Sequence, residues 1–321
     1  MRTQTRNNSL LEVADLLKSP KRVAITTHVG ADGDAIGSSA ALVHLMRALG
    51  AEAVFCHAED VPGYLRWLLP DEPLRELPEN YDLLVVDTSR ADRTGVPMPE
   101  RGARLNLDHH EDNPFYGEYN LVNARAAASA ELVADLYAEL GVELSGPAAE
   151  AVYVGLRTDT GGFRFRNVSP RCHEMVADLL RAGVVPAVVD DRINRTGTIE
   201  QLNIVGVCLA KAQRYGEAII TTVDNDDYAR TGAGELDSKE AIDTLRTVAG
   251  VDVVAHLREV PAGTKGSLRS ETVDVGEIAR RFGGGGHRLA AGYTRPGMRP
   301  EEAREELLGI LADVVDLGDT R

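Results

Sequence analysis

The chain has 321 residues, with 35 Lys and Arg against 50 Asp and Glu, so its formal net charge is −15. At about 150 residues per domain this length indicates two domains, and the content of 26% charged and 43% hydrophobic residues argues against disorder. The acidic balance argues against a protein that coats long nucleic acid, because such binding depends on phosphate neutralisation by Lys and Arg. The longest uncharged stretch, residues 35–46, is shorter than the roughly 20 apolar residues of a membrane span. We therefore expect no membrane association. Three separated cysteines without a CxxC pair argue against a disulfide framework, so we expect a cytoplasmic protein.

Short β-branched or apolar runs alternate with helical patterns in the first half of the chain. The predicted strands are 22–27, 51–56, 82–87 and 103–108, and the predicted helices are 36–49, 126–140, 147–157 and 171–182. The third strand is apolar on successive residues, which is typical of a strand buried on both faces of a parallel sheet. This alternation predicts an α/β domain with a doubly wound, mostly parallel sheet.

The second half predicts a smaller α/β unit. We expect a catalytic domain at 1–189, a connecting helix at 190–214 and a second domain at 215–321. The predicted elements of the second domain are strands 217–224, 251–260 and 264–270, and helices 238–247, 275–282 and 300–315. Between positions 256 and 299 there are eight basic and four acidic residues, and such a local excess indicates either a solvated surface or a place where an anion binds.

Acidic and histidine side chains occur where predicted elements end. They are His28, Asp32 and Asp34 after strand 22–27, Asp87 at the end of strand 82–87, Asp108, His109 and His110 at the end of strand 103–108, and Asp159 after helix 147–157. One such Asp is usually a turn or cap residue, but ligands of open α/β sheets bind at the carboxyl ends of the strands. Carboxylate and imidazole donors without thiolate suit Mn²⁺ or Mg²⁺, with Zn²⁺ and Co²⁺ as alternatives. The donors suffice for two metals about 3.5–4 Å apart, a spacing that favours displacement at phosphorus.

Six motifs in this order carry a resemblance to a known family. They are THVGADGDAIGS (27–38), VVDTSR (85–90), LDHH (107–110), TDTGGFRF (158–165), SLRS (267–270) and FGGGGH (282–287). The chain resembles the DHH–DHHA1 phosphoesterases, and within them the bifunctional oligoribonucleases (nano-RNases) that also dephosphorylate 3′-phosphoadenosine 5′-phosphate (pAp). It has Ala31 where that family usually has Pro, and Ala127, Ala128 and Ser129 where it usually has Ser-Ser-Thr.

The resemblance implies an active site in the cleft between a DHH domain and a DHHA1 domain, with two divalent metal ions, most commonly Mn²⁺. It implies His28 and Asp32 as ligands of one metal, Asp34, His109 and Asp159 as ligands of the other, and Asp87 as the bridge. His110 would contact the scissile phosphate and protonate the leaving oxygen, and Asp108 would orient a histidine.

The second domain is expected to bind the anionic end of the substrate. The predicted contacts are Arg269, Ser270, Gly284, Gly285, Gly286 and His287, because backbone N–H groups of a glycine run and a guanidinium can bind phosphate. Phe163 and Phe165 alternate with arginines, which favours a half-buried strand, while stacking of a base on a phenylalanine stays open.

The expected activity is hydrolysis of very short RNA to mononucleotides and of pAp to AMP, with short RNA, pAp and pApA as partners. Enzyme alternatives are a phosphodiesterase for cyclic di-AMP or pApA, a RecJ-like exonuclease, which usually has a further OB-fold domain, and a family II pyrophosphatase, which lacks GGGGH. An inactive nucleotide-binding module would predict loss of a ligand, and none is lost. An exposed edge of the first domain could support a homodimer.

Overall fold

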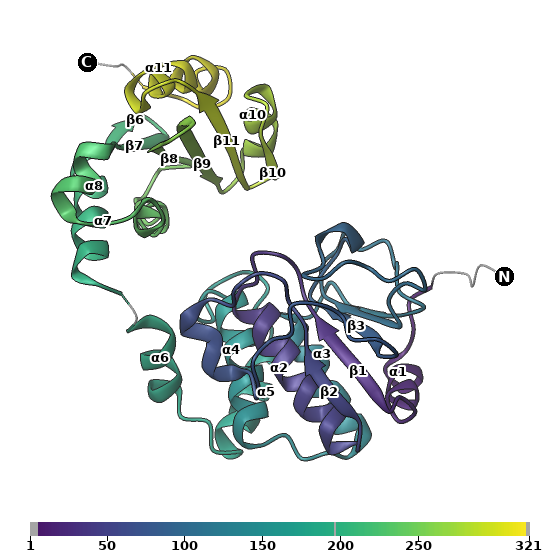
Figure 1. The fold of residues 1–321 in the computed structure, drawn as a ribbon. Coiled ribbons are helices and arrows are strands. Elements are labelled where there is room, and N and C mark those ends of the chain that lie inside the picture. Colours follow the sequence, from purple (N-terminus) through teal and green to yellow (C-terminus); the bar gives the residue numbers. More distant parts are fainter. Residues whose placement is uncertain (1–5, 196, 319–321) are drawn as a thin grey trace. The chain divides into compact units, whose positions relative to one another are not determined.

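The computed structural model describes residues 6–195 and 197–318, and the chain divides into two compact units, 1–196 and 197–321 (Figure 1). Among the described residues, no helix has the length and apolar character needed to cross a bilayer.

The first unit contains a five-stranded parallel sheet in the order β2-β1-β3-β4-β5. Its strands are β1 (Arg22–Thr26), β2 (Glu52–Phe55), β3 (Asp82–Val86), β4 (Leu105–Asp108) and β5 (Tyr119–Val122). This order is one of the two common doubly wound orders, so the predicted α/β class is confirmed. In such sheets the direction of winding reverses between β1 and β3, which is where ligands bind. The fifth strand, β5, was not predicted.

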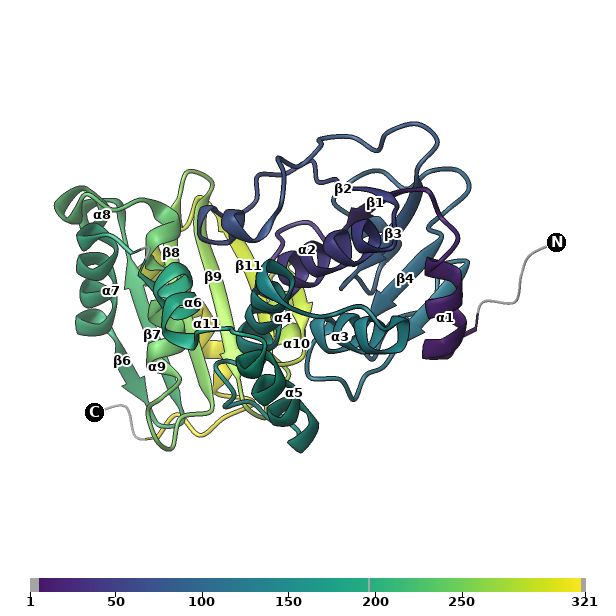
Figure 2. The same cartoon turned by 90° about the horizontal axis from the view of Figure 1, so that it is seen from below.

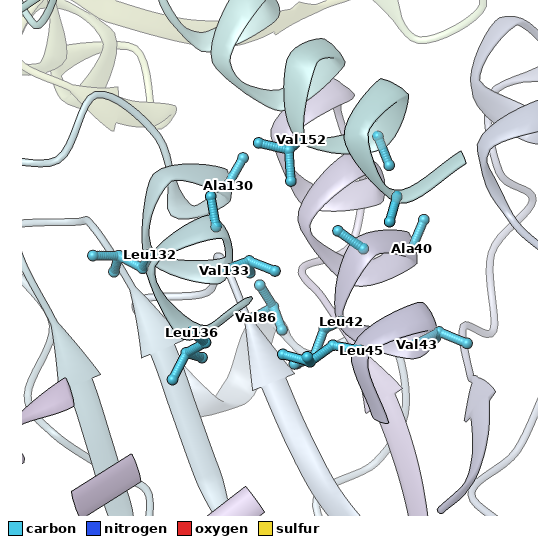
Figure 3. Packing of buried hydrophobic residues seen from close by; sticks show 14 of the residues in the cluster. Ala40, Leu42, Val43, Leu45, Val86, Ala130, Leu132, Val133, Leu136 and Val152 are labelled. Atoms are coloured by element: carbon cyan, nitrogen blue, oxygen red, sulfur yellow. The ribbon is translucent and has the colours of Figure 1, made fainter. Parts of the chain in front are cut away.

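Helices lie on one face of this sheet, the first three in direct contact with it and the others packed on helices or on a 3₁₀ turn, and loops cover the other face. The helices are α1 (Leu10–Leu17), α2 (Gly33–Ala48), α3 (Ser129–Leu140), α4 (Gly146–Asp159), α5 (Pro170–Arg181) and α6 (Pro186–Asn194), with 3₁₀ turns η1 (Gly63–Leu68) and η2 (Ala91–Arg93). Figure 3 shows side chains of α2 and α3, among them Leu42, Leu45 and Val133, gathered around Val86 of β3. A separate apolar cluster around Leu83 and Val85 lies on the opposite face.

Small residues let α2 and α4 approach each other closely. A Cβ atom at Gly37 would overlap the carbonyl oxygen of Ala151, and one at Gly155 would lie 2.7 Å from Oδ1 of Asp34. The glycines therefore determine how closely α4 approaches the start of α2, where Asp34 lies.

The second unit contains a six-stranded sheet in the order β10-β11-β9-β8-β7-β6. Its strands are β6 (Gln213–Tyr215), β7 (Ala218–Val223), β8 (Val253–Val260), β9 (Gly263–Ser270), β10 (Gly285–His287) and β11 (Ala290–Pro296). Only the pair β7–β8 is parallel. The predicted strands 217–224, 251–260 and 264–270 are confirmed, whereas β6, β10 and β11 were not predicted.

Both faces of the second sheet carry helices, but not to the same extent. One face is covered by α10 (Val275–Arg281) and α11 (Pro300–Leu311), whose apolar residues pack on β7, β8, β9 and β11. The other carries α7 (Ile199–Lys211), α8 (Asn225–Thr231), η3 (Glu235–Ser238) and α9 (Ala241–Leu245), which pack on β7 and β8. In Figure 2, β9 and β11 lie beyond β8, away from α7 and α8. Within the described residues of the second unit, no helix packs on the second face of β9, β11 and β10.

The prediction of one connecting helix at 190–214 is wrong. The segment contains the end of α6, then α7, which begins anew at Ile199, and then β6. Helix α7 begins here because Thr198 forms a capping box. Thr198 Oγ1 accepts from Gln201 N, and Gln201 Oε1 accepts from Thr198 N.

Candidate metal centre

Four segments of the first unit bring carboxylates and imidazoles together at the carboxyl end of its sheet. They are the loop from β1 into α2, the residue after β3, the end of β4 with the next two residues, and the last residue of α4. Asp159 thus lies inside α4, not after a helix ending at 157 as predicted. The possible metal-binding groups are His28, Asp32 and Asp87; Asp34, His109 and Asp159; and Asp87, His109 and His110. Within each group the donor atoms lie within 4.8 Å of one another.

Asp87 presents one carboxylate oxygen to each side of this cluster. Its Oδ2 lies 3.7 Å from Nε2 of His28, and its Oδ1 lies 3.5 Å from Nε2 of His109. These separations are longer than hydrogen bonds, as expected of donors arranged around a cation. The two oxygens therefore belong to different donor groups, which is the arrangement of a bridging carboxylate.

The backbone of Asp87 adopts a conformation that few residues other than glycine adopt. Its φ is +52°, its N–H donates to Leu107 O at 2.9 Å, and Ser129 Oγ donates to its Oδ1 at 2.9 Å. Burial would raise the pKa of Asp87, but the surrounding histidines, His28 first, hold it below its ordinary value. Left-handed backbone at a buried carboxylate is typical of a functional site, where the surrounding structure enforces the strain.

Asp34 is buried and its carboxylate accepts three hydrogen bonds. Oδ1 accepts from Ser38 Oγ at 2.7 Å and Ala130 N at 3.0 Å, and Oδ2 accepts from Ser129 N at 2.6 Å. A carboxylate has about four lone-pair positions, so one on Oδ2 remains. Oδ2 is also the oxygen nearer to the histidine side of the centre, 3.9 Å from Nε2 of His109. Asp34 therefore fits a single-oxygen metal ligand.

Two histidines are oriented by backbone carbonyl groups. Nδ1 of His28 lies 3.0 Å from Val29 O, and Nδ1 of His109 lies 3.3 Å from Ala126 O. A carbonyl oxygen can only accept, so Nδ1 carries a hydrogen in both rings and Nε2 is the nitrogen that can bind a metal. Nε2 of His109 also lies 3.6 Å from Asp159 Oδ2. Both Nε2 atoms thus face carboxylates of the cluster, which is the orientation required of metal ligands.

Asp108 belongs to none of the three donor groups and instead holds the histidines that follow it. Its Oδ1 accepts from Nδ1 of His110 at 2.7 Å and from His109 N at 2.9 Å, and its Oδ2 accepts from Asn113 Nδ2 at 2.6 Å. The hydrogen bond to Asp108 raises the pKa of His110 to about 9, so this imidazole is protonated at neutral pH. Its Nδ1 proton points to Asp108, which leaves Nε2–H free to donate.

Three polar residues that sequence reasoning missed support the centre. Asn113 links Asp108 to Asn106, His57 donates from Nε2 to the carbonyl oxygen of His28 at 3.0 Å, and Asn167 donates to the carbonyl oxygen of Asp159 at 3.1 Å. None of the three belongs to a motif with a known catalytic or metal-binding role. Each supports the centre through a hydrogen bond that forms only in the folded chain. Only the presence of polar residues close to the motifs could have drawn attention to them.

The donor set fits divalent cations. Oxygen and imidazole nitrogen donors without thiolate suit Mn²⁺ and similar ions. Burial, Asp87 and Asp159 raise the pKa of Asp34, and burial raises the pKa of Asp159 to about 6. Several carboxylates buried together repel one another, and cations bound among them would remove that repulsion. The cluster can therefore bind divalent metal.

In the second unit the strand register places Arg269 and His287 on one face. Arg269 of β9 pairs with Ala290 of β11, which pairs with His287 of β10, so their side chains project from the same side. This is the side opposite Leu268, whose side chain packs under α10 and α11. The described residues include no carboxylate within 4.0 Å of the Arg269 guanidinium. A cation and an imidazole thus flank a small residue on the face that carries no described helix of the second unit.

Two other predicted contacts of the second unit have internal partners. Ser270 Oγ donates to Asp252 Oδ1 at 2.6 Å and accepts from Val273 N, and Gly284 N donates to Ala279 O at 2.8 Å. Gly285 and Gly286, by contrast, are exposed in the edge strand β10. The groups free to meet a ligand on this strand are therefore Gly285, Gly286 and His287.

Comparison with known proteins identifies the family. Residues 22–156 match the DHH family, N-terminal domain, and residues 217–316 match the DHHA1 domain. A Thermus thermophilus protein named bifunctional oligoribonuclease and PAP phosphatase NrnA is 37% identical over 303 residues, which are 92% of this chain and 91% of that protein. The chain belongs to the DHH–DHHA1 family of phosphoesterases.

A further sequence relative and two similar solved structures agree with this fold. The NrnA protein of Bacillus subtilis is 25% identical over 278 residues, 85% of this chain and 88% of that protein. An exopolyphosphatase-related protein from Bacteroides fragilis has a similar structure, with TM-score 0.84, 21% identity and coverage of 95% and 96% of the two chains. RecJ from Thermus thermophilus, solved with Mn²⁺, has TM-score 0.53 and 17% identity, covering 96% of this chain and 55% of RecJ.

Removing one carboxylate charge should stabilise the metal-free protein. The pKa of Asp159 is about 6 in the folded chain, above its ordinary value of 3.8, so its ionised form costs stability at every pH above about 6. Without metal at pH 7.5, Asp159→Asn should melt several degrees above wild type in a thermal unfolding scan. The difference should shrink at pH 5, where wild-type Asp159 is mostly protonated.

Exposed Asp15 provides the control, because Asp15→Asn should leave the melting temperature nearly unchanged. With Mn²⁺ added, wild type should gain more than Asp159→Asn. Destabilisation of the metal-free Asp159→Asn protein would contradict this electrostatic account.

Proposed function

We propose that this protein is a two-metal phosphoesterase that hydrolyses very short RNA to mononucleotides and pAp to AMP, with Mn²⁺ as its metal. The observation that carries the proposal is Asp87, whose two oxygens lie in two different donor groups at the reversal point of a doubly wound sheet. Its NrnA relatives, named for oligoribonuclease and PAP phosphatase activity, support the choice of substrates.

Residues of the first unit would hold the metals and move a proton. His28 and Asp32 would hold one ion, Asp34, His109 and Asp159 the other, and Asp87 both. When bound, two divalent ions lower the pKa of water and offset charge on phosphoryl oxygens. His110, oriented by Asp108, would contact the scissile phosphate and donate its Nε2 proton to the leaving oxygen.

Residues of the second unit would bind the far phosphate or nucleotide. Arg269 offers a guanidinium without an ion-pair partner among the described residues, and His287 lies across Ala290 from it. Gly285 and Gly286 would let the backbone of the edge strand approach the anion. This division keeps positioning on one unit and chemistry on the other.

A comparison of initial rates tests the proposed function. With Mn²⁺, the protein should hydrolyse pAp, pApA and RNA of two and five nucleotides much faster than RNA of twenty-four nucleotides. Fast hydrolysis of the 24-mer would favour a RecJ-like exonuclease, and activity on pApA or cyclic di-AMP alone would favour a dinucleotide phosphodiesterase. No hydrolysis of any of them by metal-loaded protein would contradict the proposal.

The role of Asp108 predicts a change in pH dependence. If His110 acts as an acid, kcat/KM on pAp falls as pH rises through the pKa of His110, which the hydrogen bond to Asp108 raises. Asp108→Asn removes that charge, so the alkaline limb should move down by at least one pH unit. Exposed Glu111 is the matched control, and Glu111→Gln should leave the limb in place. An unmoved limb in Asp108→Asn would mean that another group supplies the proton.

The second unit predicts a loss that depends on the substrate. Arg269→Ala and His287→Ala should keep both metals, yet lower kcat/KM on pAp and dinucleotides roughly 10–150-fold, because a charge-assisted contact contributes about 1.5–3 kcal/mol. On bis-p-nitrophenyl phosphate Arg269→Ala should lose much less. Arg280, exposed on α10 at the opposite face, is the control. Equal losses on both substrates would place Arg269 at the reacting phosphate, and lost metal would indicate a structural role.

A further inference from the structure

The segment after the metal-centre residue Asp159 is a tight loop and not the half-buried strand that alternation of Phe and Arg predicts. Gly161, Gly162 and Phe163 all have positive φ, at 58°, 71° and 66°. Thr160 O accepts the N–H groups of both Arg164 at 2.9 Å and Phe165 at 3.0 Å. Successive left-handed residues cannot continue a strand, so the two phenylalanines do not share the environment that alternation implies.

The two phenylalanines have different surroundings. Phe163 packs inward, with ring centroids 6.1 Å from Tyr153 and 5.9 Å from His173. The side chain of Phe165 is 50% exposed, and it is the one exposed phenylalanine of the five in the chain, all of which lie in the described residues. Phe163 thus accounts for the packing of this loop, while Phe165 has an exposed ring that packing does not explain.

The ring of Phe165 is held close to Asp159. The tip of the ring rests against Gly161, where a Cβ atom would overlap it. Two residues later, Asn167 Nδ2 donates to the carbonyl oxygens of Asp159 at 3.1 Å and Ala127 at 2.8 Å. The loop is therefore tied to the metal centre on both sides of the ring, and the ring is presented without the entropy of a free side chain.

Two cations without carboxylate partners flank this ring. Arg164 and Arg166 are exposed, and within residues 6–195 and 197–318 neither guanidinium lies within 4.0 Å of a carboxylate. Arg164 Nε donates instead to Gly161 O at 2.7 Å. Nearby Arg157 and Arg171 are, by contrast, ion-paired. In a chain with net charge −15, an aromatic ring between two uncompensated arginines is the combination that binds single-stranded nucleotides.

We propose that Phe165 forms a nucleobase subsite, on which the base of the nucleotide held at the metal centre stacks, with Arg164 and Arg166 adding positive potential for its phosphates. This inference rests on the proposed function. It adds a determinant of substrate class, because stacking selects nucleotides over sugar phosphates and other phosphate esters. Every base has a π face, so the subsite would accept different sequences.

AMP and ribose 5-phosphate are matched probes, since they differ only in the adenine. Their dissociation constants are measured by calorimetry on the Mn²⁺-loaded full chain, for wild type and for Phe165→Ala, Phe165→Leu and Phe165→Tyr. Phe165→Ala should weaken AMP binding about 5- to 150-fold and leave ribose 5-phosphate unchanged. Phe165→Tyr should bind AMP like wild type, and Phe165→Leu should not restore binding. Leu180→Ala, at an exposed site on α5, is the control.

The outcomes separate the subsite from the proposed function. Equal weakening of both ligands, full restoration by leucine, or unchanged AMP binding in Phe165→Ala would each overturn stacking, even if the protein hydrolyses pAp. Failure of wild type to hydrolyse pAp and short RNA would instead overturn the proposed function. Metal content of each variant, measured in parallel, should equal that of wild type, and lost metal would mean that the ring supports the loop of Asp159.

Discussion

The arrangement of helices around the metal centre depends on the hydrogen bonds that the Asp34 carboxylate accepts. This carboxylate accepts the N–H groups of Ser129 and Ala130 and so caps α3, because Ala128, at the N-cap position, has no side chain that could do so. Gly155 of α4 leaves room for the same carboxylate. One buried group thereby joins the start of α2 to the start of α3, with α4 packed closely beside it, and keeps a lone pair for a cation. The capping donors are backbone groups, so the alanines that replace hydroxyl residues before α3 leave these bonds intact.

The sequence predicts the parts of the centre that depend on local position. Donors such as Asp87 and His109 directly follow a strand, and parallel strands bring their ends to one edge of the sheet, so proximity follows from chain order. The positive φ of Asp87 has no local signal, because Leu107 and Ser129 enforce it from distant segments. The role of His57 could not be predicted for the same reason, because its hydrogen bond to the carbonyl oxygen of His28 joins residues far apart in the sequence.

The second unit shows where sequence patterns fail for strands. Apolar runs predicted β7 and β8, and segment 264–270 was expected to pair as a further strand. Strands β10 and β11 consist largely of glycine, alanine and polar residues, so their strand conformation comes from pairing, β11 with β9 and β10 with β11. The predicted glycine loop is therefore divided between two roles. Gly283 and Gly284 donate to carbonyl groups of α10 and end that helix, while Gly285 and Gly286 continue into the edge strand.

Charge links metal binding to substrate binding. Asp32, Asp34, Asp87 and Asp159 carry four negative charges when ionised, and they would repel a phosphate ester. Two divalent ions would balance them, so a phosphate could approach only a loaded centre, where the cations also keep the carboxylates ionised. Arg269 needs no such loading, because its guanidinium is always charged. Under the proposed function, the second unit would bind an anion whether or not the centre is loaded, whereas hydrolysis would require the bound ions.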